Sequence, residues 1–243
     1  MDPAIVVLIG LAALATSALT AVLGFGGGVV LLALLLLVVD PLVAIPLHAG
    51  IQVVSNGTRT LIRRTDVDWS IVAPFSLLFL PAGALVIPLV TRAPQAALQV
   101  AIAVTVLVAT WLPERSGSTI PAPSRGAWVG AGAVIGGLNV AVGATGPLQA
   151  PLLRAGTTSR MAFVGTFAAI QTIGHLVKIM LFGLAGFAPT SYLAATAVGI
   201  AGVVAGTHLG SRALDRMPEA RFGRLYLVAI SAVCLYLLAD AAW

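Results

Sequence analysis

The glycine-rich stretch GFGGG (24–28) interrupts a long apolar run, and a related stretch, GATGP (143–147), follows 119 positions later. The apolar segments behind them, 28–39 and 147–157, are too short to cross about 30 Å of hydrocarbon as helices. Each stretch therefore predicts a hairpin or a broken helix with non-helical backbone at membrane depth. Such backbone is tolerated only where it is buried in protein or lines a cavity.

Other residues recur at the same spacing. Gln52 is matched by Gln171, Arg59 by Lys178, and Gly83 by Gly202. Amide and cationic side chains inside apolar helices are costly, so their duplication predicts one site built by two repeats. Glycine-interrupted hydrophobic segments at corresponding positions of two halves are typical of a secondary transporter.

The composition indicates a membrane protein throughout. Hydrophobic residues make up 59% of the chain and charged residues 9%, whereas a soluble domain has about 25% charged residues. The start, MDPAIVVLIG, has no basic residue, so we expect part of the first membrane segment there rather than a cleaved signal peptide. The other apolar segments are expected at 4–23, 43–63, 69–91, 95–112, 126–142, 161–181, 189–210 and 222–241.

We predict an all-α polytopic membrane protein with a first repeat (1–112), a connecting loop (113–124) and a second repeat (125–243). Each repeat would be a broken-helix hairpin plus three transmembrane helices. Because three crossings are an odd number, the second repeat would be inverted.

The arginines favour this inverted arrangement over parallel repeats, which would split them nearly evenly. One side then holds Arg63, Arg64, Arg115, Arg125, Arg154, Arg160, Arg212, Arg216, Arg221 and Arg224. The other side holds Arg92. Cytoplasmic loops carry the excess of Lys and Arg, so both termini are predicted to face the periplasm or exterior.

A polar stripe runs along segment 43–63, where spacings of four, four and three place the polar residues on one helix face. Its members are His48, Gln52, Asn56 and Arg59, and the same register in the second repeat gives Phe167, Gln171, His175 and Lys178. An anion crossing the protein would meet a cation near each mouth and neutral donors between them. The alternatives are that the glutamines join helices by hydrogen bonds and that Arg59 only reaches the membrane interface.

The two breaks are the second part of the predicted site. Its members there are Gly24, Gly26, Gly27 and Gly28 in the first repeat and Gly143, Thr145 and Gly146 in the second. A half-helix that starts at such a break directs free backbone N–H groups and its positive dipole end at the cavity, which favours an anion. Pro147 suits the first turn of that half-helix. The alternative is that the glycine spacing only allows close packing of helices.

The positions of the other ionisable residues exclude several classes of function. All eight acidic residues lie at segment ends, so a cation or metal-ion transporter is disfavoured, and no metal site or cofactor is expected. Proton coupling would use His48, His175 or a proton carried by the substrate. Cys234 is expected to serve packing, and the sequence contains no enzyme motif. The net charge of +5 is spread over segment ends, which indicates membrane orientation rather than nucleic-acid binding.

Two long stretches resemble a known family. LTAVLGFGGGVVLLALLLLVVDPLVAIPLHAGIQ (19–52) resembles the TauE/SafE sulfite exporters, also called sulfonate-uptake permeases, and GGLNVAVGATGPLQAPLLRAGTTSRMAFVGTFAAIQ (136–171) is similar to the same module repeated. The resemblance implies a multi-pass transporter of the bacterial inner membrane for small sulfur-containing anions, such as sulfite, sulfoacetate or other organosulfonates. It also implies secondary transport driven by the proton gradient.

Three functions are therefore compared below. The first is a secondary transporter with alternating access, whose partners are a small anion and the lipid bilayer, with no nucleic acid. The second is an anion channel or uniporter in the same scaffold, and the third is a membrane scaffold subunit without transport. A homodimer is left open as the oligomeric state.

Overall fold

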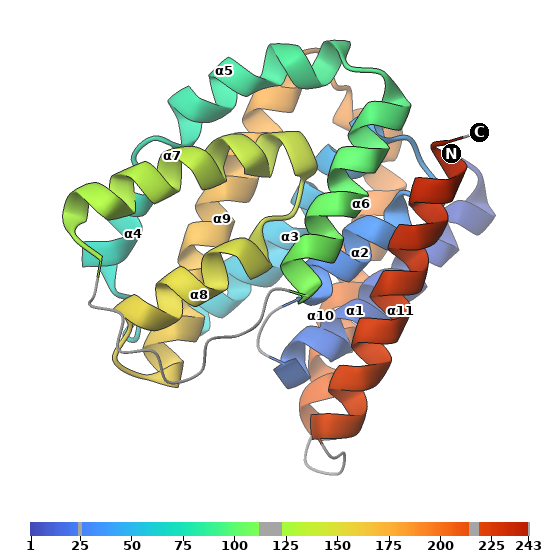
Figure 1. The fold of residues 1–243 in the computed structure, drawn as a ribbon. Helices are drawn as coiled ribbons and strands as arrows, with labels where there is room; N and C mark the ends of the chain where they lie inside the picture. Colours follow the sequence, from blue (N-terminus) through green and yellow to red (C-terminus); the bar gives the residue numbers. More distant parts are fainter. Residues whose placement is uncertain (24–25, 112–122, 214–218, 243) are drawn as a thin grey trace.

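A computed structural model describes residues 1–23, 26–111, 123–213 and 219–242, and the regular structure in these ranges is helical (Figure 1). The predicted apolar segments agree with the helices to within a few residues, so the all-helical fold class is confirmed. The elements are α1 (Pro3–Leu23), α2 (Gly27–Leu35), α3 (Pro41–Ile62), α4 (Trp69–Ser76), α5 (Phe79–Arg92), α6 (Gln95–Trp111), α7 (Arg125–Val142), α8 (Gly146–Gly156), α9 (Arg160–Leu184), the 3-10 helix η1 (Pro189–Tyr192), α10 (Leu193–Ala213) and α11 (Glu219–Asp240).

Local sequence explains where several helices begin. The side chains of Asp68, Ser124 and Ser159 accept hydrogen bonds from backbone N–H groups of the first turns of α4, α7 and α9, which pairs donors that a helix start leaves free. α4 and α5 are separated at residues 77–78, just before Pro81. Proline has no N–H to donate to the carbonyl four residues earlier, so the helix is interrupted there.

Both predicted breaks are confirmed. α2 has nine residues and starts after Gly26, whose φ is 96°. α8 has eleven residues and follows Gly143, whose φ is 75°. At about 1.5 Å per residue, neither helix can cross a bilayer. α2 also packs back against the last turns of α1, as a hairpin requires.

Equivalent helices of the two halves run antiparallel. Pro41 starts α3 and Arg160 starts α9, again 119 positions apart. The Thr60 and Thr172 hydroxyl oxygens are 3.3 Å apart, and the Asp68 N–H donates to Thr166 Oγ1 at 2.9 Å, so the end of α3 lies beside the start of α9. In the same way, Gln99 near the start of α6 donates to the Leu237 carbonyl near the end of α11, and Trp111 at the end of α6 donates to Ser231 Oγ, further toward the start of α11.

The packing partners are also exchanged between the halves. α1 packs along α10, while α7 packs along α4 and α5 (Figure 1). The Ser17 hydroxyl donates to the Val203 carbonyl at 2.9 Å in the first of these interfaces. In the second, a β-carbon at Gly132 would lie 1.7 Å from the Phe75 carbonyl oxygen, so only glycine allows this approach. Each half therefore packs mainly on the other, as expected for two repeats related by a two-fold axis.

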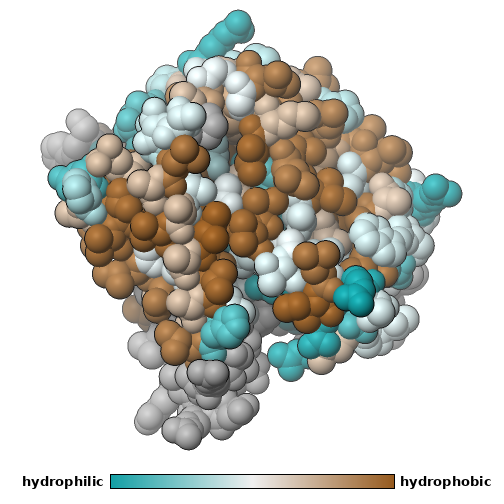
Figure 2. All heavy atoms as spheres, turned by 180° about the vertical axis from the view of Figure 1, so that it is seen from behind, coloured by the Kyte–Doolittle hydropathy of each residue, from teal (hydrophilic) through white to brown (hydrophobic). Residues whose placement is uncertain are grey.

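The outer surface is strongly apolar, as expected of a membrane protein. Large side chains such as Leu85, Leu184 and Val228 are exposed. Apolar residues cover the middle of the face in Figure 2, with hydrophilic residues nearer its edges. By length and composition, three stretches of the described residues can cross a membrane: Trp69–Arg92, Arg160–Leu184 and Thr190–Leu209. This is fewer than predicted. α3, with 22 residues, is long enough to cross a membrane. It is not among the three stretches because the polar residues of its stripe lower its mean hydropathy.

Charged residues gather at one end of the α3–α9 pair. A β-carbon at Gly165 would lie 3.2 Å from the Arg63 carbonyl oxygen, so Arg63 and Arg160 mark the same end. A β-carbon at Gly156 would lie 2.4 Å from the Trp128 ring, which brings the end of α8 to the start of α7. Arg115 and Arg216 lie outside the described residues.

Candidate functional site

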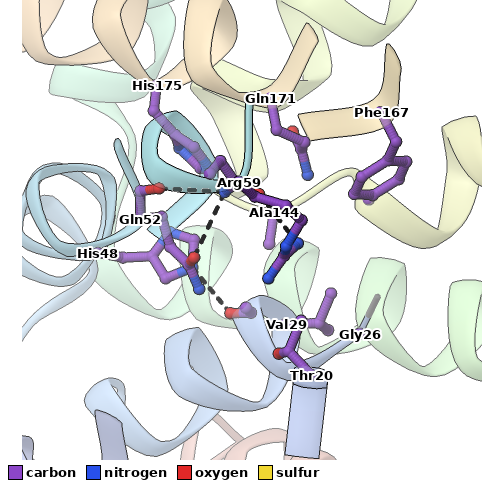
Figure 3. A pocket seen from close by; sticks show the side chains of 13 residues that line it. Thr20, Gly26, Val29, His48, Gln52, Arg59, Ala144, Phe167, Gln171 and His175 are labelled. Carbon is purple, nitrogen blue, oxygen red and sulfur yellow. Dashed lines mark hydrogen bonds between the residues drawn. The ribbon is translucent and has the colours of Figure 1, made fainter. Parts of the chain in front are cut away.

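A cavity of about 30 Å³ lies between the two helix breaks (Figure 3). A water molecule needs roughly 10–15 Å³ of such space, so the cavity is small in this conformation. α1, the two half-helix starts, α3 and α9 all contribute to it. Its lining residues are Thr20, Gly26, Gly28, Val29, His48, Gln52, Asn56, Arg59, Ala144, Gly146, Phe167, Gln171 and His175.

The first-repeat end of the cavity is formed by the start of α2 and the polar stripe of α3. A β-carbon at Gly28 would lie 2.7 Å from Gln52 Nε2, so the amide group lies directly against the half-helix. His48 Nε2 and the Gly28 carbonyl oxygen are 2.8 Å apart and share a hydrogen bond. The glycine at this position therefore keeps space for an amide donor beside the helix start.

The second-repeat end has the same layout with different chemistry. A β-carbon at Gly146 would lie 3.1 Å from Gln171 Nε2 and 3.2 Å from the tip of the Phe167 ring. Gln171 is the repeat equivalent of Gln52, so each half-helix start faces one glutamine amide. At the position equivalent to His48, the cavity meets the apolar ring of Phe167.

The half-helix starts offer unequal numbers of backbone donors. The N–H groups of a first helical turn have no partner within the helix. In α2 these include the groups of Gly27 and Gly28, since Val29 already donates to the Gly26 carbonyl at 3.0 Å. In α8, Pro147 has no N–H and Leu148 donates to the Thr145 carbonyl at 3.1 Å. The first repeat therefore presents the larger share of backbone donors.

Arg59 supplies positive charge to the cavity wall. The residue is half-buried, and its Nη1 lies 3.5 Å from Asn56 Oδ1. Asn56 Nδ2 in turn donates to the Gln52 carbonyl at 3.1 Å, so the stripe of α3 is internally connected. Among the described residues, no carboxylate lines the cavity. A cation with neutral donors and no counter-charge is an environment suited to an anion.

Two histidines from the different repeats meet at the cavity. The rings of His48 and His175 are 5.4 Å apart between centroids and nearly perpendicular. Both are buried, and the Nδ1 atom of each has no hydrogen-bond partner among the described residues. Buried polar atoms are normally paired, so these two nitrogens are unsatisfied hydrogen-bonding positions on residues of the cavity wall.

Lys178 lies elsewhere than the prediction placed it. The side chain is fully buried and is not part of the cavity wall. Its Nζ donates to the carbonyl oxygen of Gly143, the residue that ends α7. Cations are favourable at helix C-termini, so Lys178 caps α7 and fixes the backbone of the second break.

The predicted residues thus divide into two groups. Nine of them line the cavity: Gly26, Gly28, His48, Gln52, Asn56, Arg59, Gly146, Gln171 and His175. Gly27, Gly143, Thr145 and Lys178 lie behind the wall, and Gly24 lies outside the described residues. Their roles in binding stay predictions.

Four lining residues were not predicted: Thr20, Val29, Ala144 and Phe167. Val29 and Ala144 adjoin the breaks in sequence, and Phe167 is the repeat equivalent of His48. Their positions next to, or equivalent to, predicted site residues were the only indication in the sequence that they line the cavity. In the described residues, no group of three His, Cys, Asp or Glu side chains is placed to hold a metal ion.

The comparisons with known proteins agree with this architecture. A search of curated proteins and a search of solved structures gave no match. The family described as "Sulfite exporter TauE/SafE" matches residues 8–237, which include both breaks and every residue of the cavity wall. The chain therefore belongs to the TauE/SafE sulfite exporter family, a family of membrane transporters.

Proposed function

We propose that this protein is a secondary transporter of small sulfur-containing anions, such as sulfite, sulfoacetate or other organosulfonates. The observation that carries the proposal is the cavity between the two breaks. It is lined by Arg59 and by the matched amides Gln52 and Gln171, without a carboxylate among the described lining residues. Sulfonate oxygens would accept hydrogen bonds from these groups and from the backbone N–H group of Gly28.

Proton coupling would use the histidine pair. His48 and His175 contribute one ring from each repeat, and their unpaired Nδ1 atoms can take up a proton as an anion enters. The neighbouring cations are Arg59 in the cavity wall and Lys178 behind it. A proton on a histidine would add positive charge beside the anion, so we expect anion and proton to move together.

Alternating access would rock one repeat against the other around the cavity. Beyond the histidine pair, the interface of α3 with its neighbours is closed by buried residues that include Leu32, Ile45 and Lys178. Toward the opposite end, Arg59 and Gln171 are partly exposed. The cavity would therefore face the Arg63 end in this conformation, and the Lys178 end would open in the alternate one.

The proposed orientation in a bacterial inner membrane places the Arg63 end in the cytoplasm and the termini outside. The antiparallel packing of α3 with α9 supports repeats of inverted topology. In a Cys234→Ala background, an impermeant maleimide should label Gln95→Cys in spheroplasts and label Thr158→Cys only after permeabilisation. Labelling of both positions in intact spheroplasts would contradict this topology.

The test of function is thermal stabilisation of the detergent-purified protein with sulfite, sulfate, thiosulfate, sulfoacetate, taurine and simple carboxylates, followed by flux in proteoliposomes. A ligand that binds only the folded state raises the melting temperature by mass action. We expect a sulfur anion to stabilise selectively and its saturable uptake to respond to a pH gradient.

Other outcomes separate the alternatives. Unsaturable flux that ignores the pH gradient would indicate a channel or uniporter. Neither stabilisation nor flux with any anion would favour the scaffold subunit.

A further inference from the structure

The cavity has two chemically different ends at positions that the repeat makes equivalent. His48 and Phe167 each precede a cavity glutamine by four residues on the long helix of their repeat. Each also lies beside the glycine of a half-helix start: a β-carbon on Gly28 would be 3.6 Å from His48 Nε2, and one on Gly146 would be 3.2 Å from the Phe167 ring. Equivalent positions of the two long helices therefore both lie beside a half-helix start, but they differ in chemistry.

The first-repeat end is polar. His48 shares a hydrogen bond with the Gly28 carbonyl, and its Nδ1 has no partner among the described residues although the side chain is only 1% exposed. Gln52 lies beside it, and His175 contacts the ring of His48. A group bound at this end meets hydrogen-bonding atoms on several sides.

The second-repeat end carries an apolar ring, Phe167, beside the Gln171 amide. The Phe167 ring is 4% exposed, and its centroid is 5.7 Å from that of Phe163, so it is held in a hydrophobic cluster. Val29 and Ala144 are the other apolar side chains of the wall. Figure 3 shows His48 and Phe167 on opposite sides of the cavity, with Arg59 between them.

This arrangement favours an anion with two unlike ends. An inorganic oxyanion carries oxygen on every side and would leave part of its surface against the Phe167 ring without a hydrogen bond, which is costly in a buried site. A sulfonate with a short carbon chain can direct its charged group to Arg59 and its carbon end to Phe167.

We propose that Phe167 is a specificity-determining residue that selects sulfonates with an apolar end over inorganic oxyanions and over sulfonates with a polar end. The inference rests on the proposed function and narrows its substrate class to organosulfonates with an apolar end, so that sulfite and sulfoacetate would be bound more weakly than these. The side chain would act by apolar contact with the uncharged part of the anion, while Arg59 and the two glutamines hold the charged part.

The experiment compares binding of 1-propanesulfonate and isethionate to the purified full-length protein. These monoanions have nearly the same shape and differ in a terminal methyl against a hydroxyl group. One apolar contact in a pocket discriminates about tenfold or more, so we expect wild type to favour propanesulfonate by that factor and to bind sulfate more weakly. Phe167→His should bring the ratio close to one, while Phe167→Leu should retain most of it.

Phe182→Leu is the matched control, because Phe182 is an equally buried ring of α9 outside the cavity wall. It should leave the ratio unchanged. Equal binding of the two sulfonates by wild type would overturn the inference and leave anion transport intact, as would an unchanged ratio in Phe167→His. Should that variant fail to fold, Phe167→Tyr takes its place: the hydroxyl at the ring tip should lower the ratio, and an unchanged ratio would overturn the inference. Binding of no anion at all would reject the proposed function together with the inference.

Discussion

The two helix breaks occupy equivalent positions but are held in different ways. In the described part of the first break, Gly26, directly before α2, has a positive φ, and Gly27 packs closely on α1. In the second break, the left-handed residue is Gly143, at the end of α7, and Lys178 binds its carbonyl oxygen. Thr145, the equivalent of Gly26, has a φ of −116°.

This difference has a sequence origin. A non-glycine residue rarely adopts positive φ, so Thr145 does not take the conformation of Gly26, and among the described residues of the second break the positive φ is found at Gly143. The first break is fixed by close packing of backbone, which does not deform easily. The second break depends on one side-chain hydrogen bond, from Lys178 to the Gly143 carbonyl. A small movement of the helices can break this bond and let Lys178 bind another acceptor. We therefore expect the second break to be the one that moves during transport.

The strongest test of this comparison replaces the equivalent glycines Gly27 and Gly146 by alanine. A β-carbon at Gly27 would lie 2.1 Å from the Thr16 carbonyl oxygen and 1.9 Å from Thr20 Oγ1, so α2 must leave α1. We expect a loss of about 3 kcal/mol or more of stability, the upper range for overpacked sites, seen as a large fall in the melting temperature.

Gly146→Ala should be much milder for the fold. Its β-carbon would meet only side-chain atoms, at 3.1 Å and 3.2 Å. The variant should melt near wild type while anion binding weakens, because the added methyl group enters the cavity wall. Equal melting temperatures for the two variants would contradict the difference between the breaks.

A cross-link between the repeats should give the next largest effect. Thr60 Oγ1 and Thr172 Oγ1 are 3.3 Å apart across α3 and α9, which suits a disulfide once both are cysteine. In a Cys234→Ala background, the oxidised Thr60→Cys/Thr172→Cys protein should lose at least about nine-tenths of its flux, because the repeats can no longer move against each other. A reductant should restore it, and each single cysteine variant should transport normally. Full flux in the cross-linked protein would rule out rocking at this interface.

Replacing Arg59 or Lys178 should have a smaller effect than the cross-link, and the two replacements should change different properties. Arg59→Met removes a charged donor from the cavity wall, and hydrogen bonds to charged groups contribute about 1.5–3 kcal/mol, so anion affinity should fall about 10–100-fold. Lys178→Met removes the cap of Gly143 outside the wall. It should slow transport while affinity stays within about tenfold of wild type. Binding measured by thermal shift and turnover measured in proteoliposomes distinguish these outcomes. An equal loss of affinity in both variants would place Lys178 at the anion.

The sequence was enough to predict the helices and much of the site, since both depend on local pattern. Apolar run length predicted helix ends to within a few residues, and helical spacing correctly placed His48, Gln52 and Arg59 on one face. Spacing does not determine how far each face is rotated toward a neighbouring helix. Lys178 shares the stripe of Gln171, but the end of α7 lies over it, and that contact depends on tertiary packing.

Phe167 shows the opposite case. The repeat register made it the equivalent of His48, yet an aromatic residue in an apolar helix resembles ordinary core. Only the opposing wall of Val29 and Ala144, contributed by the two breaks, distinguishes it as part of a cavity. The same holds for Thr20, which adjoins the first break and reaches the cavity because α2 folds back on α1.

The smallest expected effect concerns Gln149 in α8, whose equivalent in the first repeat is Val30. The Gln149 side chain is fully buried, and neither its Oε1 nor its Nε2 has a partner among the described residues. An unpaired buried amide costs about 1–3 kcal/mol, so Gln149→Leu should raise the free energy of unfolding by about 1 kcal/mol, measured by thermal or denaturant unfolding in detergent. The reciprocal change Val30→Gln should destabilise. If Gln149→Leu instead lowers both stability and flux, the amide is paired in the alternate conformation, and the second break moves further in transport than the first.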